Sequence, residues 1–236
     1  MPHSRSLALI ASVLLPLSAA PPLLAQEKEK PVVAIPQAGV PQIMTIEGTF
    51  VRAAYNNEGY VILGYQLANR SIGEEWLLLE VGMTVLDRTP NYTIRPADFS
   101  LTIPGGQSIP LPSVEEYRKA DTRALKNRER VQRDSINYFP PMASRPCAMV
   151  FYPDLDQRTL PRDDVELSSS RACLGRLYFK VPGGIKYGQY WLDVKFEKSV
   201  VRVPFRILTE DEEKLLSKNY KDIRKQVQDA FKPKKK

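Results

Sequence analysis

Carboxylate side chains are the main residues in this chain whose type and spacing could support catalysis or metal binding. Asp154 and Asp156 stand two residues apart, and Asp163 and Asp164 follow shortly after them. Such carboxylates could ligate Ca²⁺, which takes roughly six to eight oxygens, or act as general acid and base in a hydrolase. The spacing does not match an EF-hand loop, and pairing with nearby arginines in a solvated loop explains these residues equally well. A hydrolase using Asp154–Asp164 is therefore kept as the alternative hypothesis, and no metal site is predicted.

Histidine chemistry is excluded from almost the whole chain, because the only histidine is His3. Ser-His-Asp sites, Cys-His sites and His-ligated zinc sites each need an imidazole as base or ligand. The sequence also has no Walker loop, no dinucleotide-binding glycine pattern and no cysteine cluster. We therefore expect a protein that is not an enzyme, has no catalytic residues and needs no cofactor.

The two cysteines, Cys147 and Cys173, are predicted to form a disulfide. The N-terminal sequence described below indicates export, and paired cysteines are usually oxidised in exported proteins. A reactive thiol is the alternative, but no histidine lies nearby in the sequence to activate it.

A second set of residues could bind a ligand rather than react with it. Apolar and polar residues alternate in three predicted strands, 174–181, 189–196 and 200–208, which would form a meander with one face in the core. The opposite face would combine cations with two aromatic rings, which suits stacking on sugar rings or bases and pairing with anions. The residues of this predicted basic face are Arg176, Tyr178, Lys180, Trp191, Lys195, Arg202 and Arg206.

The predicted basic face has three interpretations. It could bind a protein or an acidic glycan of the cell envelope, and the net charge of +7 gives weak support for acidic partners. It could be an ordinary solvated surface, where lysine and arginine oppose edge-to-edge aggregation. It could also be covered by the C-terminal helix, as Trp191 would favour. We do not expect a specific nucleic acid as partner.

The elements that must position these residues are mostly short β-strands. Apolar residues suited to strands precede the meander in five segments, 44–54, 60–68, 76–87, 99–103 and 107–111, with turn residues between them. This pattern is typical of an antiparallel sandwich or barrel and not of alternating strands and helices. We predict one mainly β sandwich over residues 43–208, with two small β domains as the alternative. Pro204 predicts that the last strand is an edge strand or is bulged, because proline cannot donate to the ladder.

Two segments have helical patterns. Residues 113–136 contain no glycine or proline and begin with a capping box, Ser113 and Glu116, which predicts a helical insertion lying along the sandwich. Residues 209–231 begin with a second capping box and carry apolar residues on one helical stripe. We expect this amphipathic C-terminal helix to dock on the sandwich, and a helix that binds a partner is the alternative.

The stretch YVILGYQLANRSIGEEWLLLEVGMTVLD resembles the strand–turn–strand unit of immunoglobulin-like sandwiches on exported bacterial proteins. In those domains an apolar strand ends in an Asn-containing turn and the next strand opens with a large apolar residue. Leu67, Asn69 and the run Trp76 to Leu79 take these parts here. The resemblance implies an immunoglobulin-like architecture and assigns no functional residues.

The N-terminus predicts export. Residues 1–25 combine a basic start, an apolar stretch too short to span a bilayer and a small residue before a polar run, as secretory signal peptides do. Residues 26–42 are predicted to be a flexible linker, and 232–236 form a basic tail. We expect a periplasmic or secreted protein with no transmembrane segment after the signal peptide. A retained N-terminal anchor is the alternative.

Overall fold

The computed structural model describes residues 42–153 and 160–230. The predicted signal peptide, the predicted linker except Gln42, and the predicted basic tail lie outside these residues, as do Asp154 and Asp156. None of the helices in the described ranges combines the length and the apolar character needed to cross a membrane.

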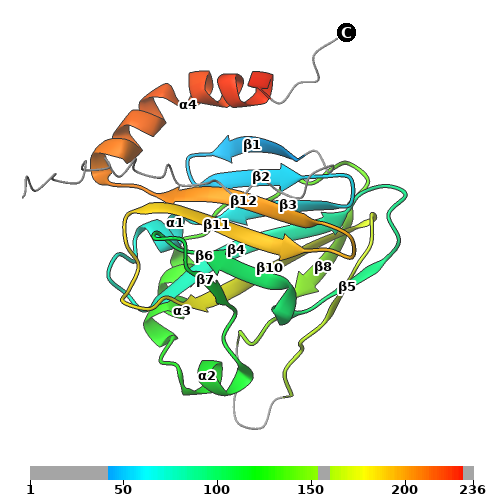
Figure 1. Ribbon diagram of the computed structural model, residues 1–236, viewed down its shortest axis with the longest axis horizontal. Coiled ribbons are helices and arrows are strands. Elements are labelled where there is room, and N and C mark those ends of the chain that lie inside the picture. The colour runs from blue at the N-terminus through cyan, green and yellow to red at the C-terminus, as the bar shows by residue number, and fades with distance from the viewer. Residues whose placement is uncertain (1–41, 154–159, 231–236) are drawn as a thin grey trace, which may run out of the picture. The chain divides into compact units, whose positions relative to one another are not determined.

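β-strands dominate the described residues and form two main sheets (Figure 1). The larger sheet contains, in order across it, β1 (Ile43–Gly48), β2 (Val51–Tyr55), β3 (Gly59–Gly64), β4 (Trp76–Val85), β10 (Arg171–Lys180) and β8 (Arg145–Met149). The smaller sheet contains β12 (Val200–Ile207), β11 (Gly188–Lys195), β6 (Phe99–Thr102) and β7 (Ser108–Pro110). A separate pair is formed by β5 (Tyr92–Ile94) and β9 (Val165–Leu167). The prediction of a mainly β protein with antiparallel sheets and a C-terminal helix is confirmed, although β8 and β10 pair in parallel.

The core lies between the inner faces of the six-stranded and four-stranded sheets. Alternate residues of a strand point to the same face, and in β11 only the inward set, Tyr190, Leu192 and Val194, is buried. Strand β4 is buried on both faces, and its core-facing set is Leu77, Leu79, Val81 and Met83. Both sheets contain strands from both halves of the sequence, because β4 pairs with β10 and β6 pairs with β11.

The predicted helical insertion near 113–136 is two short helices, α2 (Val114–Lys119) and α3 (Arg123–Val131), followed by irregular backbone. The capping box at Ser113 is present, with its hydroxyl accepting a 3.2 Å hydrogen bond from the Glu116 N–H. A single helix would place Leu125 about 80° around the axis from Tyr117. The break at Ala120, which is extended, allows both Tyr117 and Leu125 to be buried.

The insertion covers the outer face of the six-stranded sheet. Tyr117 contacts Tyr178 of β10, with ring centroids 5.5 Å apart. Further along, Phe139 lies against Gly82 of β4, where an added Cβ would be 2.7 Å from its ring. Gly64 of β3 accommodates Asp134 in the same way. The two glycines, Gly82 and Gly64, therefore provide room for the insertion on this face.

The C-terminal helix, α4 (Glu210–Ala230), packs against β1 at one edge of the six-stranded sheet. Its start is capped by reciprocal hydrogen bonds between Thr209 and Glu212. The Tyr220 hydroxyl donates to the Ile46 carbonyl, and Arg224 pairs with Glu47 at 2.6 Å. Two short helical turns, α1 (Gln66–Asn69) and η1 (Pro96–Asp98), connect strands.

Candidate functional site

The predicted three-stranded meander is wrong, because its first strand belongs to the other sheet. Strand β10 pairs with β4 and β8, whereas β11 pairs with β12 and β6. The chain crosses between the sheets through Pro182-Gly183-Gly184, and both glycines have positive φ. Alternation in the sequence identifies the buried face of a strand, but both sheets bury their inner faces in the same core. The pattern could therefore not assign β10 to a sheet.

Three residues of the predicted basic face consequently lie apart from the others, on the outer face of the six-stranded sheet. Tyr178 is only 3% exposed, because α2 covers it. Arg176 forms an ion pair with Glu129 of α3, and Lys180 pairs with Glu75 at 3.2 Å. The structure therefore does not bring the seven predicted residues together on one face.

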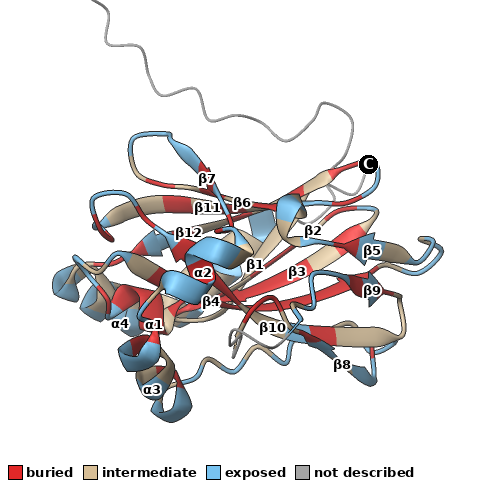
Figure 2. Ribbon diagram, turned by 90° about the horizontal axis from the view of Figure 1, so that it is seen from below, coloured by how far each residue is buried: buried red, intermediate tan, exposed pale blue. Residues whose placement is uncertain are grey.

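The other four residues lie on β11 and β12 of the four-stranded sheet. Trp191, Lys195 and Arg202 share its outer face, which we call the open face, because no helix in the described part of the chain packs over it (Figure 2). Trp191 is partly exposed and lies in register with Thr102 of β6 and Pro204 of β12.

An ion pair stands beside Trp191 on the open face. Arg202 donates two hydrogen bonds of 2.6 Å to the two carboxylate oxygens of Asp193, and this contact raises the pKa of Arg202. Arg206 lies further along β12 and is directed to Glu212 of α4, at 2.8 and 3.0 Å. The open face thus offers an aromatic ring, a bidentate ion pair and the exposed Lys195.

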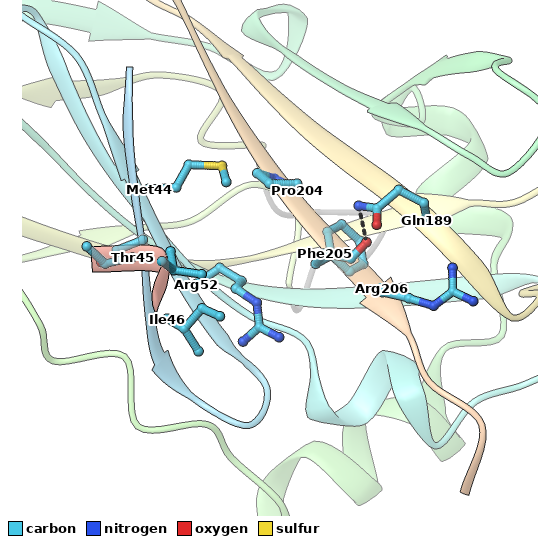
Figure 3. A pocket seen from close by; sticks show the side chains of 10 residues that line it. Met44, Thr45, Ile46, Arg52, Gln189, Pro204, Phe205 and Arg206 are labelled. Carbon is cyan, nitrogen blue, oxygen red and sulfur yellow. Dashed lines mark hydrogen bonds between the residues drawn. The ribbon is translucent and has the colours of Figure 1, made fainter. Parts of the chain in front are cut away.

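A groove of about 230 Å³ lies between the edge strands β1 and β12, beside α4 (Figure 3). Its lining is largely apolar and includes Met44, Ile46, Pro204 and Phe205. Pro204 stands in the edge strand of its sheet, as predicted.

Both arginines of this groove are already engaged. Arg52 donates to the carbonyls of Gly48 and Val51 at 2.9 Å and lies over the Tyr65 ring, 5.2 Å from its centroid. Burial lowers the pKa of Arg52. Because Arg206 pairs with Glu212, the groove presents no arginine without a partner for an anionic ligand.

A larger pocket of about 450 Å³, which was not predicted from the sequence, lies on the outer face of the six-stranded sheet. Its charged lining residues are the carboxylates Glu80 and Asp134 and the arginines Arg133 and Arg176, and the rest of its lining is apolar or glycine. Glu129, which is 4% exposed, holds Arg176 and also contacts Arg133 at 3.4 Å. A signal was present in the sequence, because Glu80 is the single charge inside the apolar run WLLLEVGMTV.

Burial perturbs two carboxyl groups in this pocket. Desolvation raises the pKa of Glu80 to about 7 and the pKa of Asp134 to about 6, although each accepts a backbone hydrogen bond that acts in the opposite direction. Carboxyl groups with such pKa values are suited to proton transfer near neutral pH, and they also occur as buried structural groups.

The acidic residues singled out in the sequence are only partly described. Asp163 and Asp164 are exposed, and Asp154 and Asp156 lie outside the described residues. Within residues 42–153 and 160–230, no group of three or more His, Cys, Asp or Glu side chains is arranged to hold a metal ion.

The predicted disulfide between Cys147 and Cys173 is confirmed. The two cysteines stand directly opposite each other in the parallel pair of β8 and β10. The bond therefore fastens the edge strand β8 to the six-stranded sheet, next to the carboxylate pocket.

Comparison of the chain with protein-family models, with curated proteins and with solved structures found no match.

Proposed function

We propose that this protein is an exported, non-catalytic module of the cell envelope that binds an acidic glycan on the open face. The observation that carries the proposal is Trp191, a large aromatic side chain that is partly exposed on an inner strand of a sheet face over which no described helix packs. Trp191 is only partly buried, and an aromatic ring that stays accessible on a sheet surface is an effective contact surface for a ligand.

The neighbours of Trp191 suit a saccharide. The C–H groups of a sugar ring can stack on the indole, while hydroxyl groups can both donate to Asp193 and accept from Arg202. Lys195 projects from the same face and adds a positive charge for a carboxylate or sulfate on the glycan. A protein is the other partner predicted from the sequence, but a sheet face with a single partly exposed aromatic ring fits a sugar chain better.

Export is part of the proposal and is supported by the disulfide, because such bonds persist mainly in oxidising compartments. We also propose an immunoglobulin-like sandwich as the finer description of the fold. Two facing antiparallel sheets support this description, and the parallel pairing of β8 with β10 is a departure from it.

The test is retention of the purified protein by an immobilised uronic-acid polysaccharide. Trp191→Ala should weaken binding about tenfold, which corresponds to about 1.4 kcal/mol. Lys195→Glu should also weaken it, and Lys180→Glu is the matched control, because it makes the same charge change on the other sheet. Failure of the unmodified protein to bind, or equal binding of Trp191→Ala, would contradict the proposal. Equal binding to a neutral polysaccharide would contradict the preference for an acidic glycan.

A hydrolase is the second candidate, favoured by one observation. The raised pKa values of Glu80 and Asp134 would allow one carboxyl to act as acid and the other as base. If this is correct, Glu80→Gln should abolish hydrolysis of a polysaccharide while leaving retention on it unchanged. The hydrolase hypothesis based on Asp154–Asp164 stays a prediction.

A further inference from the structure

Helix α4 carries a row of lysines along one side. Its members Lys214, Lys218, Lys221 and Lys225 are all exposed, and we call them the lysine row. With 3.6 residues per turn they fall within about 60° of one another around the axis and extend over about 17 Å. Asp222 is the only acidic residue between Lys214 and Lys225.

The opposite side of α4 is occupied by the protein itself. Leu216, Tyr220, Ile223 and Val227 are all partly buried on that side, and the Tyr220 hydroxyl bonds to β1. Ion pairs from Arg70 to Glu213 and from Arg206 to Glu212 hold the first turns. The helix is thus fixed in an orientation that directs the lysine row to solvent.

The charges of the lysine row are largely available to a partner. Lys214 approaches Asp211 only at 3.8 Å, and within the described residues the other three lysines have no ion-pair partner. The sequence continues after the helix with Phe-Lys-Pro-Lys-Lys-Lys, which adds four cations. The acidic residues of the first turn lie at the other end, where they complement the helix dipole.

We propose that the lysine row is a docking surface for the anionic headgroups of a lipid bilayer. A row of lysines suits a diffuse negative surface, because each ammonium is a point charge on a flexible stem and needs no fixed partner geometry. Glycans and single-stranded nucleic acids are usually held by aromatic stacking as well, and the row contains no aromatic residue. Leu215, 62% exposed beside the row, provides an apolar contact with the headgroup region.

Binding at this surface would be electrostatic and peripheral, because the apolar side of α4 is already used by β1. Each lysine near an anionic membrane contributes about 1 kcal/mol, so that replacing two of them should weaken binding about thirtyfold. The attraction should also decline steeply as salt rises. This surface lies on α4, whereas the proposed glycan site lies on β11 and β12, so the two proposals can fail independently.

The experiment is co-sedimentation with lipid vesicles of the chain from Gln26 onward, which is the expected mature start. One set of vesicles is phosphatidylcholine alone, and the other contains roughly 30% phosphatidylglycerol as the anionic lipid. The unmodified protein should bind only the anionic vesicles at low salt. The pair Lys218→Gln and Lys221→Gln should lose about thirtyfold in partitioning. The control pair, Lys180→Gln and Lys186→Gln, removes the same charge elsewhere and should bind within about twofold of the unmodified protein.

Three results would overturn the proposal: no binding to anionic vesicles, equal binding to neutral vesicles, or the same loss in both pairs of variants. Circular dichroism of each variant checks that it is folded. Trp191→Ala should bind vesicles normally, and the lysine-row pair should retain its affinity for the polysaccharide. These cross-checks separate membrane docking from glycan binding.

Discussion

The backbone N–H of Asp134 donates a 2.6 Å hydrogen bond to the carboxylate of Glu80. The Asp134 carboxylate in turn accepts a 2.8 Å hydrogen bond from the backbone N–H of Gln66. These two bonds fasten the irregular segment after α3 to β4 of the six-stranded sheet and to α1, at a site where both carboxyls are largely removed from water. The insertion is therefore held by two carboxyl groups whose ionised forms are destabilised by burial.

The first prediction concerns the pH dependence of stability. Because the folded-state pKa of Glu80 is raised to about 7 and that of Asp134 to about 6, the folded protein binds protons more tightly than the unfolded chain. The contribution of these groups to stability is fully present below about pH 4 and is lost as the pH rises to about 7. Allowing for solvent screening, the change from Glu80 is on the order of 2 kcal/mol.

Urea unfolding between pH 4 and 8 measures this effect. Glu80→Gln keeps an oxygen that accepts from Asp134 but cannot ionise, so its profile should be flatter than that of the unmodified protein over this range. An unchanged slope in Glu80→Gln would show that Glu80 does not titrate in this range.

The second prediction concerns the glycines under the insertion. A Cβ on Gly64 would lie 2.5 Å from the Cβ of Asp134, so Gly64→Ala should displace the segment and lower the free energy of unfolding by about 1–3 kcal/mol. In Gly48→Ala the added methyl would meet Val51 at an ordinary 3.4 Å. Chemical denaturation of both variants makes the comparison, and an equal loss in both would argue against this packing.

The third prediction concerns the disulfide. Free-thiol labelling of denatured, unreduced protein should give almost no signal. Replacing Cys147 and Cys173 together by alanine should lower the free energy of unfolding by about 3–4 kcal/mol, because the bond closes a loop with a sequence separation of 26. Stoichiometric labelling would contradict the bond in the native protein.

The fourth prediction concerns Asn69, whose side-chain oxygen accepts a 2.5 Å hydrogen bond from the backbone N–H of Leu208. Asn69 is 5% exposed, and Asn69→Ala would leave the Leu208 N–H buried without this partner, at a cost of about 1–3 kcal/mol. Asn91, which bonds to Glu166 at the surface, provides the control, and Asn91→Ala should change the thermal midpoint little. Similar midpoints for the two variants would refute a structural role for Asn69.

Local patterns in the sequence predicted most of the strands but not β5, β8 or β9. They also predicted the capping boxes at Ser113 and Thr209, the edge position of Pro204 and the pairing of the two cysteines. The strands, the caps and the proline position each depend on residues that are close in the chain. The disulfide was predictable because Cys147 and Cys173 are the only two cysteines in the sequence. Such features follow from alternation, turn chemistry and capping, which operate over a few residues.

Only the tertiary structure decided which surfaces exist. It assigned β10 to one sheet and β11 to the other, which buried Tyr178 beneath α2 and left Trp191 partly exposed. It also brought Glu80 and Asp134 together across 54 residues of sequence. Alternation shows which side of a strand is buried, but it does not show which sheet the strand belongs to. The reason is that two sheets facing one core impose the same period of two on every strand.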